Sequence, residues 1–142
     1  MNVDSITDGI VIDHITAGRG MLIYKLLEIE GKGHSVAIIM NVNSKKLGKK
    51  DIIKIDADIE VNFDVIGYVD PGATVNIIRQ GKLAKKLNLD MPEMLTNVIK
   101  CKNPRCITSV EQELDHVFKL TDKKNSVYRC IYCETEAAPH QV

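Results

Sequence analysis

The sequence is poor in aromatic residues and has no net charge. The first property limits the composition of its core, and the second excludes some classes of binding protein. It contains no tryptophan and only two phenylalanines in 142 residues, although 44% of its residues are hydrophobic. We therefore expect folded cores built mostly from aliphatic side chains. Nineteen basic residues balance nineteen acidic ones. This neutrality argues against a general binder of nucleic acids or membrane surfaces, because such proteins usually carry a net positive field.

The sequence also lacks segments that would direct a chain into or across a membrane. Its first ten residues, MNVDSITDGI, have neither the basic start nor the apolar stretch of a signal peptide. No uninterrupted apolar run approaches the roughly 20 residues needed to cross a bilayer. We therefore expect a soluble, cytoplasmic protein.

The four cysteines all lie in the last third of the chain. Cys101 and Cys106 form a C-x4-C loop, and Cys130 and Cys133 form a C-x2-C loop. In a reducing cytoplasm, such paired loops are typical of metal thiolates rather than of disulfides. Two tight turns on neighbouring strands can supply the four tetrahedral ligands that Zn²⁺ prefers, so the spacing predicts one zinc ion. Because sulfur would fill every position, we expect a structural metal with no site for an activated water.

The segment that carries these cysteines, residues 95–142, is close to the size below which a hydrophobic core alone rarely suffices. Metal binding is therefore expected to supply much of its folding free energy. We expect a thin aliphatic core between β-ribbons, built from Val98, Ile107, Val110, Val117, Leu120, Val127 and Ile131.

The first two thirds of the chain alternate between strand and helix patterns. Apolar and polar residues alternate in four segments, which predicts strands over 9–16, 34–42, 51–60 and 73–79. Residues 21–26 (MLIYKL) favour a short helix after the first strand, and a helical turn over 64–68 precedes the last strand. We expect a basic loop over 43–50. The order β-α-β-β-α-β is that of a ferredoxin-like antiparallel sheet, which carries both helices on one face and leaves the other face free.

The character of the chain changes after the fourth strand. Residues 82–94 (KLAKKLNLDMPEM) mix lysines with Asn, Asp and Pro, which predicts a last short strand that runs into a connection between domains. We place the boundary near residue 95, which gives domains over 1–94 and 95–142. The expected fold class is α+β, with a ferredoxin-like βαββαβ sheet domain followed by a small zinc-ribbon-like β domain.

Several motifs, in order along almost the entire chain, resemble those of the regulatory chains of aspartate carbamoyltransferase. They are residues 9–15 (GIVIDHI), 49–55 (KKDIIKI), 73–78 (ATVNII) and both cysteine loops. The resemblance implies a non-catalytic subunit of pyrimidine biosynthesis, whose N-terminal domain binds nucleotides and whose zinc domain docks on the catalytic chain. In that family CTP and UTP inhibit, ATP activates, and the regulatory chains pair through their effector domains.

Carried over position by position, the resemblance also implies an effector site on the N-terminal domain. Asp13 and Lys54 resemble the groups that reach the ribose, and His14 and Lys86 those that reach the phosphates, with Lys85 as the alternative to Lys86. Ile6 and Val11 resemble positions that line the base, and the pocket is flanked by Asn76 and Ile78. These residue types suit the assignment, because a triphosphate needs converging cations and a ribose diol needs an acceptor and a donor.

The assignment depends on local geometry at Asp13 and His14. Neighbouring side chains on a strand point to opposite faces, so both can serve one ligand only at a strand end or a bulge. Gly81 stands where better-known members of the family carry a tyrosine near the base, so we expect the base to be held either less firmly or by a different neighbour. Within the basic loop, Lys50 is the residue that we expect to add positive potential near the phosphates.

Two other functions are compatible with a chain that binds zinc. A zinc ribbon that contacts nucleic acid is disfavoured by the neutral charge, and a zinc hydrolase is disfavoured by four sulfur ligands. The glycines of residues 18–20 (GRG) and 31–33 (GKG) are interpreted as turn glycines rather than phosphate-binding loops. We assign no metal role to His34, His116 and His140.

Overall fold

The computed structural model describes residues 6–46 and 48–137, and these form two compact units. The first unit ends at Asp90 and the second begins at Met91, whereas the sequence placed the boundary near residue 95. Residues just after Asp90 are bound to strands of the second unit and belong to it. The Tyr128 hydroxyl donates to the carbonyl oxygen of Pro92 over 2.7 Å, and the Leu120 N–H donates to that of Glu93 over 2.8 Å. His140 lies outside the described residues.

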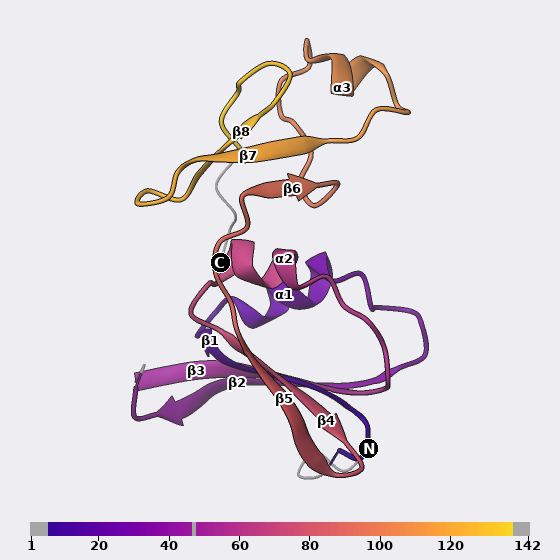
Figure 1. Cartoon of the computed structure of the whole chain (residues 1–142), viewed down its shortest axis with the longest axis vertical. Coiled ribbons are helices and arrows are strands. Elements are labelled where there is room, and N and C mark those ends of the chain that lie inside the picture. The colour runs from indigo at the N-terminus through magenta and orange to yellow at the C-terminus, as the bar shows by residue number, and fades with distance from the viewer. Residues whose placement is uncertain (1–5, 47, 138–142) are drawn as a thin grey trace. The chain divides into compact units, whose positions relative to one another are not determined.

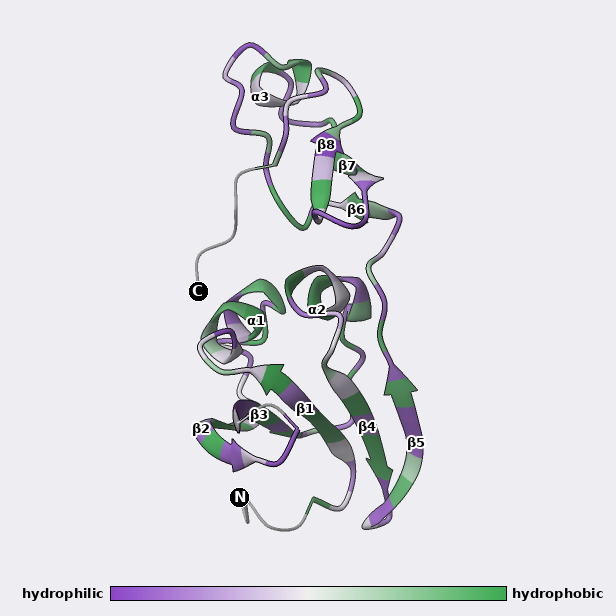
Figure 2. Cartoon of the chain, turned by 90° about the vertical axis from the view of Figure 1, so that its left-hand side faces the viewer, coloured by the Kyte–Doolittle hydropathy of each residue, from purple (hydrophilic) through white to green (hydrophobic). Residues whose placement is uncertain are grey.

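The first unit is a five-stranded antiparallel sheet with two helices. The strand order is β2-β3-β1-β4-β5, so β3 lies between β1 and β2, which confirms the expected ferredoxin-like arrangement. Figures 1 and 2 show α1 and α2 together on one face of the sheet. The elements are β1 (Gly9–Thr16), α1 (Gly20–Leu26), β2 (Ser35–Ser44), β3 (Gly48–Asp56), α2 (Phe63–Val69), β4 (Thr74–Arg79) and β5 (Lys82–Asn88).

The core of this unit lies between the helices and the central strands. Ile12 of β1 pairs with Ile53 of β3 and with Val75 of β4, and all three side chains are fully buried. Ile23 of α1 and Ile66 of α2 are also fully buried. This core is aliphatic, as the shortage of aromatic residues predicted. Residues that alternate with these in the strands lie on the other face, which no helix of the described part of the unit covers.

The expected basic loop over 43–50 is too long, and the third strand is misplaced. β2 continues to Ser44 and β3 already begins at Gly48, so Lys49 and Lys50 are strand residues. β3 ends at Asp56, although the alternation of apolar residues continues to residue 60. The physical reason is backbone pairing, because Asp56 lies opposite Ser35, the first residue of β2, and has no further partner strand beyond it.

The second unit is a small three-stranded antiparallel sheet in the order β6-β7-β8. Its elements are β6 (Met94–Thr96), the single turn α3 (Ile107–Val110), β7 (Val117–Asp122) and β8 (Val127–Cys130). Its buried residues Leu95, Phe118 and Tyr128 come from the three strands and are 1% exposed. Over the described residues, neither unit contains a helix with the length and apolar character needed to cross a bilayer.

The aliphatic core expected for the second unit is therefore wrong in part. Ile107, Val110 and Ile131 are 50%, 68% and 44% exposed, and aromatic rings take the central positions instead. Ile107 and Ile131 directly follow buried cysteines, Cys106 and Cys130. Because those cysteine side chains turn inward, the residues beside them point outward.

Candidate metal centre and effector site

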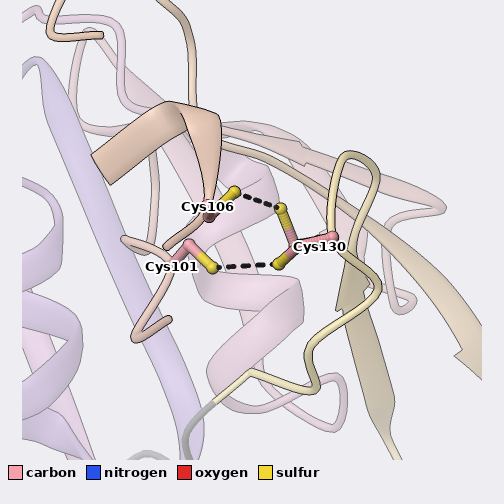
Figure 3. Close-up of side chains that lie close together, drawn as sticks. Cys101, Cys106 and Cys130 are labelled. Atoms are coloured by element: carbon pink, nitrogen blue, oxygen red, sulfur yellow. Dashed lines mark hydrogen bonds between the residues drawn. The ribbon is translucent and has the colours of Figure 1, made fainter. Parts of the chain in front are cut away.

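The four cysteines come together in the second unit. The Sγ atoms of Cys101 and Cys133 lie 3.6 Å apart, and those of Cys106 and Cys130 lie 3.7 Å apart. All four sulfurs lie within 4.8 Å of one another. Figure 3 shows the side chains of Cys101, Cys106 and Cys130 turned toward one another. Sulfurs bound tetrahedrally to zinc at about 2.3 Å stand about 3.8 Å apart, so this spacing fits a zinc thiolate site.

The surroundings of the sulfurs differ. Thr108 Oγ1 lies 3.1 Å from Cys106 Sγ, and Thr135 Oγ1 lies 3.2 Å from Cys133 Sγ. Hydrogen bonds with these hydroxyls and from the backbone N–H of the same threonines lower the pKa of Cys106, and they lower the pKa of Cys133 to about 6. Burial raises the pKa of Cys101 to about 12 and raises that of Cys130. A coordinated metal deprotonates all four thiols, so zinc can hold each of them as a thiolate.

His116 contacts the first cysteine loop without being part of the sulfur cluster. Its Nδ1 accepts a hydrogen bond from the backbone N–H of Cys101 over 3.2 Å. Its own backbone N–H donates to Asn97 Oδ1 over 2.9 Å. The ring therefore fixes the backbone of a cysteine, and the set of candidate ligands remains the four sulfurs. Four thiolates in a tetrahedron are typical of zinc or iron and leave no open position for water.

Four of the residues predicted for the effector site form one row across the open face of the first unit. Strand pairing places Lys54 of β3 beside Val11 of β1, Val11 beside Asn76 of β4, and Asn76 beside Lys86 of β5. Paired residues share a face of the sheet, so all four lie on the face opposite the helices. Lys85 pairs with Ile77 and lies on the helix-covered face. The structure thus places Lys86, and not Lys85, with the other residues of the row.

Asp13 and His14 lie at a β-bulge. Both stand opposite the single β3 residue Ile52, because the pairing of β1 with β3 shifts there by one residue. His14 has a φ of 58°. Its Nδ1 lies 3.8 Å from Asp13 Oδ2 and 3.1 Å from Oγ1 of Thr74, which pairs with Asp13. The two side chains therefore lie close together, which meets the geometric condition for serving one ligand.

Lys50 contacts this pair directly. Its Nζ lies 2.9 Å from Asp13 Oδ1, and the His14 backbone N–H donates to the same oxygen over 2.6 Å. Burial opposes ionisation of Asp13, but the hydrogen bonds from Lys50 and His14 outweigh burial and lower the pKa of the carboxyl. Asp13 is therefore ionised at neutral pH and can accept hydrogen bonds. The strand position of Lys50, missed in the sequence, is what brings it to Asp13.

Ile6, which precedes β1, and Ile78 of β4 both lie beside Gly9, the first residue of β1, and thus away from the bulge. Gly9 pairs with Ile78, and a Cβ at Gly9 would stand 2.6 Å from Cγ2 of Ile6. Ile6 thus packs closely against Gly9. The backbone N–H of Gly81 donates to the carbonyl oxygen of Thr7 over 2.9 Å, which ties the turn after β4 to the same segment. Ile6 and Ile78 therefore lie at one end of β1, and Asp13, His14 and Lys50 lie at the other.

Sequence reasoning missed three threonines that contact the predicted sites. Thr74, which holds the His14 ring, gives no signal in the sequence because its role depends on pairing between distant strands. Thr108 and Thr135 each stand two residues after the second cysteine of a loop. This repeated C-x-T pattern is visible in the sequence and could have been found.

Comparison with known families and proteins gives the relatives of this chain. Residues 1–90 match the family described as aspartate carbamoyltransferase regulatory chain, allosteric domain, and residues 93–142 match the metal binding domain of the same chain. The chain is 52% identical to the aspartate carbamoyltransferase regulatory chain of Clostridium tetani over 94% of each chain. It is 48% identical to that of Clostridium botulinum, over 94% of this chain and 92% of the relative. It is 42% identical to that of Bifidobacterium longum, over 96% and 99%.

Proposed function

Because this chain belongs to the family of aspartate carbamoyltransferase regulatory chains, we propose that it binds nucleotide effectors with its first unit and docks on the catalytic chain with its second. It is a regulatory chain and not a catalytic one. Its second unit is a metal-binding domain with a four-cysteine site for one structural zinc ion. We place its work in cytoplasmic pyrimidine biosynthesis, with CTP and UTP as inhibitors and ATP as the activator.

The effector proposal is carried by the bulge at Asp13 and His14 beside the row from Lys54 to Lys86. Three strand spacings separate the ends of this row, which is about 14 Å. Lysines stand at both ends of the row and apolar residues lie beside the start of β1, so an extended ligand with anionic groups and an apolar part fits such a face. In the proposal, His14 and Lys86 bind the phosphates and Asp13 and Lys54 the ribose. Ile6 and Val11 line the base in this proposal, and Asn76 and Ile78 flank the pocket.

The docking proposal is supported by apolar side chains that the second unit exposes beside its cysteines. Ile107 and Val110 follow Cys106, and Ile131 and Tyr132 follow Cys130. Each of the four is at least 44% exposed. The sulfurs of Cys106 and Cys130 lie 3.7 Å apart, so zinc would hold the two segments beside each other. Exposed apolar groups held on a rigid support are typical of protein interfaces.

Pairing of two regulatory chains is supported by the edges of the first unit. The edge strand β5 carries Lys82, Lys85 and Lys86, and lysines on an edge oppose pairing with another strand. The other edge, β2, has ten residues without a charge and exposes 55% of Met40. We therefore propose that two copies pair along β2.

A matched pair of lysine variants tests the effector site. In the full-length zinc-loaded chain, we expect Lys86→Ala to weaken CTP and ATP binding about 10-fold, because a hydrogen bond to a charged group contributes about 1.5–3 kcal/mol. Lys85→Ala removes the same charge from the other face of β5 and should leave both affinities unchanged. Titration calorimetry measures both. Equal losses in the two variants would point to net charge alone, and unchanged binding by Lys86→Ala would contradict the site.

A further inference from the structure

Two threonines occupy equivalent places around the four cysteines. Thr108 stands two residues after Cys106, and Thr135 stands two residues after Cys133. Their hydroxyl oxygens lie 3.1 Å and 3.2 Å from the respective sulfurs. Each cysteine loop therefore ends in a sulfur with a hydroxyl partner supplied by the residues that follow it.

Zinc binding fixes the direction of these hydrogen bonds. A zinc-bound thiolate carries no hydrogen, so each threonine hydroxyl must be the donor and each sulfur the acceptor. Thr108 is only 3% exposed. A buried hydroxyl without a partner is costly, and valine has nearly the same shape without that cost. The acceptor sulfur of Cys106 explains why a polar residue occupies this buried position.

We propose that Thr108 and Thr135 are positioning residues of the metal centre, whose hydroxyls offset the charge of the zinc thiolates and so slow the loss of zinc. Four thiolates around Zn²⁺ leave a net charge near −2. Such a charge in a largely buried site is unfavourable, and a hydrogen bond donated to a charged sulfur reduces its cost. The inference rests on the zinc-binding role of the second unit, and not on the identity of the effectors or of the docking partner.

The two threonines should not contribute equally. Thr108 and Cys106 are both buried, so no water can replace a lost hydroxyl there. Cys133 and Thr135 are half-buried, so a water molecule can donate to Cys133 in place of the hydroxyl. We therefore assign the larger effect to Thr108.

Transfer of zinc from the full-length chain to a chromophoric chelator tests the proposal. We expect Thr108→Val to release zinc at least about 10-fold faster, which is the usual size of effect for groups that hydrogen-bond to metal ligands. Thr135→Val should show a smaller acceleration. Thr108→Ser keeps the hydroxyl and should release zinc at nearly the original rate. Thr121→Val is the matched control, because the Thr121 hydroxyl contacts the carbonyl oxygen of Val127 instead of a sulfur.

Cobalt substitution separates a hydrogen bond from simple packing. The sulfur-to-cobalt charge-transfer band should move to lower energy in both valine variants, since a thiolate without a donor gives up electron density more easily. A variant whose fold is merely loosened would not show a band shift that Thr108→Ser restores. If both valine variants keep the original release rate and spectrum, or if Thr108→Ser behaves like Thr108→Val, the proposal is wrong.

Two further outcomes remain decisive. If Thr108→Val does not fold with zinc, the spectrum and release rate of Thr135→Val still decide the question, because Thr135 is only half-buried. A natural chain that binds no zinc at all would instead contradict the metal site itself. Failure to bind nucleotides or the catalytic chain would leave this inference intact.

Discussion

Asp51 is a buried carboxylate that fixes the backbone at the start of α1 and at the irregularity of β2. Its Oδ2 atom accepts hydrogen bonds from the backbone N–H groups of Gly18 and Gly20, and its Oδ1 atom accepts one from Asn41, each over 3.0 Å. Its side chain is fully buried. A Cβ at Gly20 would stand 2.9 Å from Oδ2, so glycine is needed for this contact. The glycines of residues 18–20 are thus structural, as expected.

Replacing Asp51 should therefore destabilise the first unit strongly. We expect Asp51→Ala to lower its free energy of unfolding by about 3 kcal/mol, because three backbone N–H groups lose their acceptor. Urea unfolding of the zinc-loaded chain, followed by circular dichroism, measures the change. Asp58→Asn is the control, since the ion pair of Asp58 with Arg79 is exposed and should contribute less than about 1 kcal/mol. A loss for Asp51→Ala no larger than that of the control would contradict this role.

Contacts between single side chains can be predicted from the sequence for the cysteine cluster but not for the Asp13–His14 pair. The grouping of the cysteines depends on two short loops, and short spacing is visible in the sequence. The closeness of Asp13 and His14 depends on a bulge against β3, and thus on the register between strands far apart in the chain. The contact between Lys50 and Asp13 has the same origin. Periodicity alone does not encode that register.

The turn between β4 and β5 gives a physical reason for Gly81. Gln80 and Gly81 have φ values of 53° and 75° and join the paired residues Arg79 and Lys82. Two consecutive positive φ values are typical of a tight hairpin turn, where glycine is favoured. No heavy atom lies within 4 Å of a Cβ built at Gly81. A tyrosine would therefore have space there but would strain the backbone by about 1 kcal/mol.

The two edge strands of the sheet differ in charge, which predicts the edge along which two copies of the chain pair. Met40→Lys places a charge on β2, and in a symmetric pair the charge occurs twice, so we expect the dissociation constant of the dimer to rise about 10-fold. Sedimentation velocity across a concentration series measures it. Leu83→Lys is the matched control on β5, where Leu83 is 59% exposed. If the two variants dissociate equally, or if Met40→Lys stays dimeric, β2 is not the pairing edge.

The order of strands and helices in the first unit was predicted correctly, but the residues at which several of them begin and end were not. Alternation identified β1 and β4 closely, because both strands are flanked by others and each has one buried face. At β3 the alternation continues past Asp56, where pairing with β2 ends. In the second unit, the inward turn of the cysteines exposes Ile107 and Ile131 and leaves the centre to Phe118 and Tyr128. In this unit, the loops that turn the cysteines inward decide which side chains are buried, even where the hydrophobicity of a residue predicts otherwise.

The two units of the chain, to which we assign nucleotide binding and docking as proposals, have different sources of stability. The first unit has an extended aliphatic core between a sheet and two helices. The second has three short strands and a core centred on Leu95, Phe118 and Tyr128. A sheet of this size depends on its metal, because zinc binding to four cysteines contributes on the order of 10 kcal/mol to folding. Zinc should thus control docking without controlling nucleotide binding.

Removal of zinc should separate the two activities. After chelation, we expect amide resonances of the second unit to lose their dispersion while those of the first unit and its affinity for CTP stay unchanged. Mixed with the catalytic chain, the metal-free protein should form no large complex in sedimentation, and added zinc should restore it. The proposed docking surface should need the metal, because Ile107 and Ile131 each directly follow a cysteine of the site. A metal-free chain that keeps its second unit folded and still assembles would show that the sulfurs do not hold this surface together.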